Sequence, residues 1–128
     1  MMQRFAAASA VASVLIALAA GCLRLIPVPT LESGYLATSI LCVAPLAWGL
    51  WAMLTPKSWL PERLPLWGAI LGLIAGLLEV FVLDLPAFRG EPLPLLGIVV
   101  LLEIIMYYLL WLPVQRAYQT LTAPSLAA

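Results

Sequence analysis

The chain has 128 residues, of which 65% are hydrophobic and 9% are charged, with six Lys and Arg balancing six Asp and Glu. Soluble domains carry about 25% charged residues, so this composition and the mean hydropathy of +1.11 exclude an ordinary soluble domain. Disorder is excluded too, because it requires low hydrophobicity and high charge. The zero net charge argues against nucleic-acid binding, and the absence of His excludes His-ligated metals, His-ligated haem and His bases.

Four apolar stretches are each long enough to cross a hydrocarbon core of about 30 Å as a helix. They cover residues 5–26, 35–54, 66–85 and 95–114. Most of the 11 prolines lie between these stretches, where they remove backbone donors and disfavour helix. Pro45 lies inside the second stretch and predicts a bend there. The predicted fold is all-α: a polytopic membrane protein with four transmembrane helices in a small antiparallel bundle, forming one domain over residues 1–128.

The positive charges predict the orientation of this bundle. Lys and Arg in short loops favour the cytoplasmic side. On one side of the predicted bundle lie Arg4, Lys57, Arg63 and Arg116, and on the other lie Arg24 and Arg89. The larger group predicts that both termini are cytoplasmic, in a bacterial inner membrane. The tryptophans map to the same side and predict an aromatic belt at that surface; they are Trp48, Trp51, Trp59, Trp67 and Trp111.

The N-terminus has a second interpretation. A basic start at Arg4, an apolar run and small residues before Cys22 resemble a bacterial lipoprotein signal, although the apolar run is longer than usual. If the signal is cleaved, Cys22 carries a lipid and three spans remain, in the same orientation. If it is not cleaved, the stretch is the first of four spans.

Small residues line one face of two predicted spans. Membrane helices associate through close packing of such residues, and positions four apart lie on one helix face. The third span has Gly68, Gly72 and Gly76 at this spacing. The first span has a milder version, formed by Ser9, Ser13, Ala17 and Gly21. The simplest expectation packs these two faces against each other; the alternative leaves one of them for a second copy or another subunit.

Three carboxylates lie within or at the edge of predicted spans. Glu79 and Glu103 are near the middle of the third and fourth spans, and Asp84 is nearer the outer surface. A charge at mid-bilayer costs at least about 2.5–3.5 kcal/mol, so these groups should face protein or water. The depths of Glu79 and Glu103 differ by only ~3–5 Å at ~1.5 Å per residue, which places them to share a site.

The same carboxylates predict a proton- or cation-binding site. No Lys or Arg lies at comparable depth, so two buried carboxylates cannot both ionise cheaply and at least one is expected to be protonated. Tyr107 follows Glu103 by one helical turn and is placed to donate its hydroxyl group. The candidate set is therefore Glu79, Glu103, Tyr107 and Asp84. The alternatives are neutral acids that donate hydrogen bonds between helices or to a partner, and side chains that face lipid.

Two functions fit this sequence best. The first is an accessory or assembly subunit that packs against other membrane subunits of a larger complex. The second is a small homodimeric proton-coupled transporter or exporter that uses Glu79 and Glu103. Its general layout resembles the small multidrug exporters, although their glutamate lies in the first span. A third, weaker option is a lipid- or quinone-modifying enzyme with Glu103 as acid or base. No cofactor, metal site or catalytic set is predicted, and the expected surroundings are the lipid bilayer and other membrane subunits.

Overall fold

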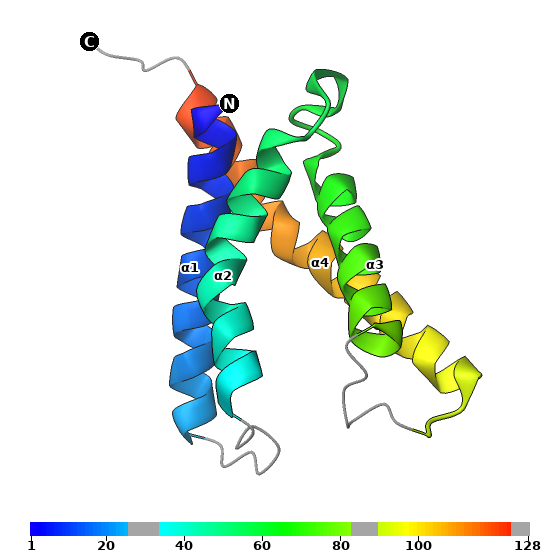
Figure 1. The fold of residues 1–128 in the computed structure, drawn as a ribbon. Coiled ribbons are helices and arrows are strands. Elements are labelled where there is room, and N and C mark those ends of the chain that lie inside the picture. Colours follow the sequence, from blue (N-terminus) through cyan, green and yellow to red (C-terminus); the bar gives the residue numbers. More distant parts are fainter. Residues whose placement is uncertain (26–33, 83–89, 124–128) are drawn as a thin grey trace. The chain divides into compact units, whose positions relative to one another are not determined.

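The computed structural model describes residues 1–25, 34–82 and 90–123 of the chain, which fold into helices (Figure 1). The described residues contain no β-strand, so the predicted all-α class is confirmed. A short 3-10 helix, η2 (Lys57–Trp59), lies between the second and third α-helices. The four α-helices are α1 (Met2–Leu25), α2 (Gly34–Met53), α3 (Leu64–Phe81) and α4 (Leu93–Thr122).

Three of the helices are long and apolar enough to cross a membrane. They are the Met2–Gly21 part of α1, the whole of α3 and the whole of α4. Within α2 the described apolar stretch is the shorter Cys42–Met53. The chain therefore has the helices of an integral membrane protein.

Two helix ends in the structure differ from the predicted ends by several residues. Helix α3 ends at Phe81 rather than at residue 85, and α4 continues past residue 114 to Thr122. The predicted ends were placed where the apolar run stops. A helix can continue past that point, because its backbone N–H and C=O groups bond to each other in water as they do in the membrane. Gln115, Arg116 and Ala117 are good helix formers, so α4 continues through them even though Pro113 lies inside it.

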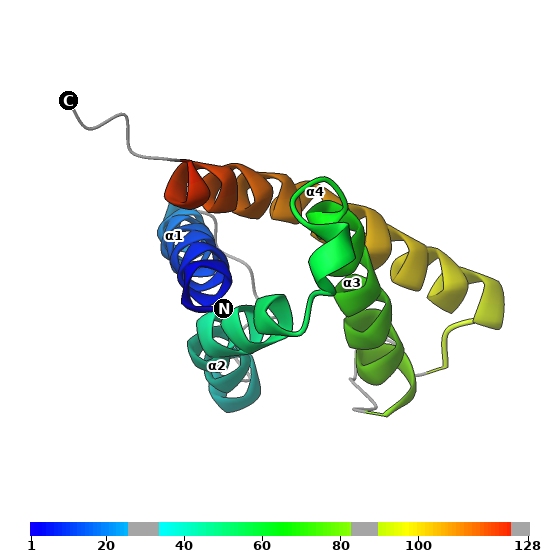
Figure 2. The ribbon, with the colours of Figure 1, turned by 90° about the horizontal axis from the view of Figure 1, so that it is seen from above.

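The chain forms two compact units. The first contains α1, α2 and the residues from Ala117 onward, and the second contains residues Thr55–Arg116 with η2, α3 and most of α4. In the first unit α1 and α2 run side by side in both views (Figure 2). The side-chain amide of Gln3 also donates a hydrogen bond to the carbonyl oxygen of Leu121, at 3.2 Å.

Helices α1 and α2 approach closely around Ser9. The Ser9 hydroxyl donates a hydrogen bond to the carbonyl oxygen of Pro45, at 2.8 Å. A Cβ at Gly49 would contact the Ser9 hydroxyl and lie 2.6 Å from a ring carbon of Phe5. Small side chains make this approach possible, because Ala8 and Ala12 are also buried on α1.

The remaining small residues of α1 do not take part in this contact. Ser13 and Gly21 are exposed, and the Ser13 hydroxyl donates to the Ser9 carbonyl oxygen of its own helix, at 2.8 Å. The expected pairing of the first-span and third-span small residues is therefore corrected. Ser9 contacts α2, whereas the glycines of α3 contact α4. Each set of small residues therefore packs against another helix of its own unit.

Candidate intramembrane carboxyl site

The glycines of α3 are buried against α4. A Cβ at Gly72 would lie 2.7 Å from the carbonyl oxygen of Glu103 and 2.8 Å from Cβ of Tyr107. A Cβ at Gly68 would lie 2.6 Å from Cβ of Trp111. No real side chain tolerates these distances, so only glycine permits the α3–α4 approach at these two positions.

Large side chains of α4 occupy the space that the glycines leave. Proceeding along α3, Gly68 faces Trp111, Gly72 faces Tyr107 and Gly76 faces Glu103. The residue numbers rise by four along α3 and fall by four along α4, as expected for two antiparallel helices. The side chains therefore interdigitate, with small residues on one helix and large residues on the other.

Trp111 does not have the environment of an interfacial tryptophan. It is completely buried, whereas the sequence predicted a place in an aromatic belt. The reason is the hollow above Gly68, which an indole ring fills. Sequence reasoning missed this role, although the matching spacing of Gly68–Gly72–Gly76 and Glu103–Tyr107–Trp111 was a usable signal.

Glu79 and Glu103 are brought together by the same packing. The Glu103 Cβ lies 3.3 Å from the position of a Cβ at Gly76, and Glu79 follows Gly76 by one turn of α3. Both glutamates are half-buried, and their carboxylates repel each other when both are ionised. Tyr107, over Gly72, lies one turn further along α4. Asp84, the fourth member of the predicted set, lies outside the described residues.

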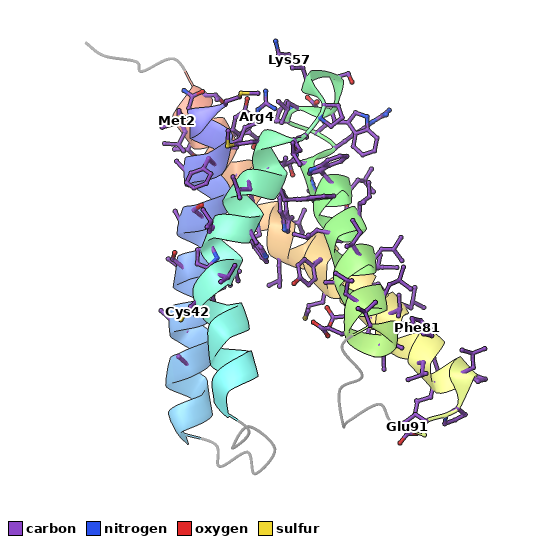
Figure 3. The ribbon with its side chains drawn as sticks, in the orientation of Figure 1. Met2, Arg4, Cys42, Lys57, Phe81 and Glu91 are labelled. Carbon is purple, nitrogen blue, oxygen red and sulfur yellow. The ribbon has the colours of Figure 1, made fainter. Side chains whose placement is uncertain are left out.

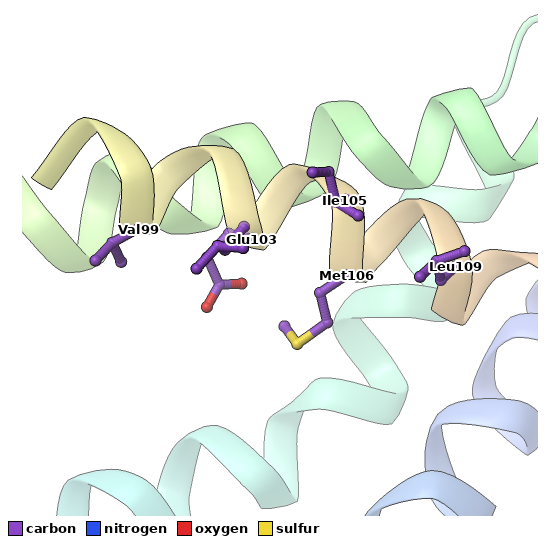
Figure 4. A pocket seen from close by; sticks show the side chains of 6 residues that line it. Val99, Glu103, Ile105, Met106 and Leu109 are labelled. Carbon is purple, nitrogen blue, oxygen red and sulfur yellow. The ribbon is translucent and has the colours of Figure 1, made fainter. Parts of the chain in front are cut away.

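Glu103 also borders a shallow depression on the surface of α4. This depression, called the α4 depression below, has a volume of about 450 Å³. Figure 4 shows the Glu103 carboxylate and the Met106 thioether pointing into the same space beside the helix. The lining residues are Val99, Leu102, Glu103, Ile105, Met106 and Leu109. Glu103 is the only charged residue among them, so it supplies the polar group of an otherwise apolar surface.

The chemistry that this site offers is that of two neighbouring carboxyl groups. They supply four oxygen atoms, fewer than the six to eight ligands that Ca²⁺ takes. Among the described residues, no three or more His, Cys, Asp and Glu side chains gather as metal ligands. Arg63, which precedes α3, is about 24 Å from Glu79 along the helix at ~1.5 Å per residue. Two neighbouring carboxyl groups can share one proton, because ionising both would place two negative charges side by side.

No protein-family model, curated protein or solved structure matches this chain.

Proposed function

We propose that this chain is a small integral membrane protein that acts as an accessory or assembly subunit, through helix–helix packing within a larger membrane complex. Its four helices cross a bacterial inner membrane as one domain with both termini in the cytoplasm. The observation that supports this function is the carboxyl group of Glu103 in the otherwise apolar α4 depression.

A carboxyl group that faces acyl chains is costly, so intramembrane acids pair with polar groups of other helices. Leu102 and Ile105, beside Glu103, are 58% and 48% exposed, so the described helices of their own unit do not cover this face of α4 and a partner helix could pack there. The glycines of α3 are already covered by α4. The partner surface is therefore the α4 depression, and a polar side chain of the partner would bond to Glu103.

A photocrosslinking experiment tests this proposal. Benzoylphenylalanine replaces Leu102, which lines the α4 depression, and the matched control replaces Leu78, which is 45% exposed on α3. Irradiation of intact membranes should give a heavier covalent adduct from the Leu102 position only. Glu103→Gln, which keeps a hydrogen-bonding group, should retain the adduct, and Glu103→Leu should reduce it severalfold.

The identity of the adduct decides the outcome. A distinct membrane protein in the adduct supports the subunit function. An adduct of two copies of this chain, or equal adducts from both positions, would contradict it.

The proximity of the two carboxyl groups favours a second candidate function, a homodimeric proton-coupled transporter or exporter. Two carboxylates that repel each other bind a proton together, and release of that proton creates a site for a cationic substrate. The test uses the purified chain in liposomes with an imposed pH gradient and tetraphenylphosphonium as the probe cation.

In this assay Glu103→Gln should abolish gradient-driven uptake of the probe, because an amide cannot release a proton. Glu62→Gln removes an exposed carboxylate before α3 and should leave uptake unchanged. Uptake that persists in Glu103→Gln at the wild-type rate would remove the transport function.

A further inference from the structure

A second surface depression lies at the start of α3, on a different face from the α4 depression. It has a volume of about 260 Å³ and is entirely apolar in its lining. The residues that line it, called the α3 groove below, are Trp59, Leu66, Ala69, Ile70, Leu73 and Ile104. Trp59 closes the end near η2 and stands edge-on to Trp67, with ring centroids 5.8 Å apart.

The α3 groove runs in the direction of a lipid acyl chain. Leu66 lies in the first turn of α3 and Leu73 two turns further, so the groove extends roughly 10 Å into the predicted membrane. A transmembrane helix is about 10 Å across and packs along several turns, so a groove this small suits it poorly. The end of one acyl chain fits the shape better.

The charges beside Trp59, at the membrane-surface end of the groove, favour an anionic headgroup. Lys57 in η2 and Arg63, at the N-terminal cap of α3, are both exposed on either side of Trp59. Figure 3 shows Lys57 pointing outward from the segment between α2 and α3. Glu62 is the one acidic residue in this segment, so the local balance is positive. The N-terminal end of α3 adds a partial positive charge that attracts phosphate.

We propose that the α3 groove binds one acyl chain of an anionic phospholipid, with its phosphate against Lys57 and Arg63. The tryptophan pair then lies at headgroup depth, where indole rings are favoured. Each cation near an anionic lipid contributes a preference of about fivefold over a zwitterionic lipid, which corresponds to ~1 kcal/mol. The site is independent of the partner or substrate proposed above and requires only that α3 crosses the bilayer.

Native mass spectrometry of the purified full chain tests the site. The probes are phosphatidylglycerol and phosphatidylcholine with identical acyl chains, supplied in equal amounts. The wild-type chain should retain one phosphatidylglycerol preferentially. Lys57→Gln with Arg63→Gln should lower this preference about 25-fold, since two cations of about fivefold each are removed. Glu62→Gln should raise it. The matched control, Arg89→Gln, removes a cation from the other side and should have no effect.

The groove itself is tested by Ala69→Leu, which fills it without changing charge. This variant should lower retention of both lipids, with helix content checked by circular dichroism. An equal loss in Arg89→Gln and the double variant would mean general charge attraction and would overturn the proposal. Unchanged retention in Ala69→Leu, or a polypeptide released in place of a lipid, would overturn it as well. If Ala69→Leu does not fold, the exposed variants at Lys57, Arg63 and Glu62 still decide.

Discussion

The backbone, the side-chain stem and the carboxyl group of Glu103 each have different neighbours. Its carbonyl oxygen lies opposite Gly72, its Cβ and Cγ lie over Gly76, and its carboxyl group borders the α4 depression. The stem is therefore part of the α3–α4 packing, and only the carboxyl group is available for chemistry. This is why Glu103→Gln, which keeps the stem, is the informative substitution, whereas Glu103→Ala would change packing and polarity together.

A prediction at the residue scale concerns the hydroxyl groups of α1. Ser9→Ala removes a hydrogen bond between two helices, and Ser13→Ala removes one within α1. Interhelical bonds in membranes average about 0.6 kcal/mol, so Ser9→Ala should lower the free energy of unfolding by ~0.5–1.5 kcal/mol. Unfolding of the chain in mixed micelles by added sodium dodecyl sulfate measures this. Ser13→Ala is the control and should have little effect; equal effects of the two variants would contradict the close contact at Pro45.

Single residues were predictable from the sequence where depth decides their position. Counting residues from the connecting segment predicts depths for Glu79 and Glu103 that differ by only ~3–5 Å, and in the structure Glu103 packs on Gly76, one turn of α3 before Glu79. The burial of Trp111 does not follow from depth and needs the matched spacing of two helices to be recognised. Its burial depends on the hollow over Gly68, which belongs to a different helix, and amphipathic preference alone assigns a tryptophan to the membrane surface.

At the scale of elements, the contact between α3 and α4 depends unequally on its glycines. A Cβ at Gly72 meets backbone oxygen at 2.7 Å, whereas one at Gly76 meets its neighbours at 3.3–3.4 Å. Backbone cannot move aside by much without shifting a whole helix. Gly76 also faces backbone, at the Val100 Cα, but a contact at 3.3 Å is relieved by a shift of a few tenths of an ångström. Gly72 is therefore the position at which the distance between the two helices is fixed.

Gly72→Ala should consequently destabilise the chain by about 1–3 kcal/mol, the usual cost of overpacking a well-packed interior. Gly76→Ala should have a much smaller effect, because the slight crowding is offset by the better helix propensity of alanine, worth up to ~1 kcal/mol. Detergent unfolding followed by circular dichroism gives both values.

Gly97→Ala is the matched control on α4, since nothing lies within 4 Å of a Cβ there. It reports helix propensity alone and should be neutral or stabilising. Equal destabilisation by Gly72→Ala and Gly76→Ala would mean that the two helices are not in the described register.

The ends of the elements were less predictable than their existence. Hydrophobicity located all four helices, because apolar runs and prolines mark where a span begins and ends. It failed beyond Pro113, where α4 continues through polar residues to Thr122. Helix formation in that part follows from backbone propensity and not from membrane burial.

At the scale of the whole molecule, the distribution of charge predicts the topology. The segment with Lys57 and Arg63 should lie in the cytoplasm, and the segment with Arg89 and Glu91 should lie outside. Single-cysteine labelling of intact bacterial cells with a membrane-impermeant maleimide measures this, after Cys22 and Cys42 are replaced by Ser. Glu91→Cys should be labelled directly, and Ser58→Cys only after the membrane is permeabilised. The reverse pattern would invert the proposed topology.

The length of α4 determines how far its C-terminal end can lie from the hydrocarbon core. Its 30 residues span about 45 Å at ~1.5 Å per residue, against a hydrocarbon core of about 30 Å. In the proposed topology the apolar part up to Val114 accounts for the core, and the turns from Gln115 to Thr122, about 12 Å long, lie beyond it. There the side-chain amide of Gln3 donates its hydrogen bond to the Leu121 carbonyl oxygen, so this end of α4 is held beside the start of α1. In that topology, a reporter fused directly after Thr122 should begin about 12 Å from the hydrocarbon core, beyond the lipid headgroups.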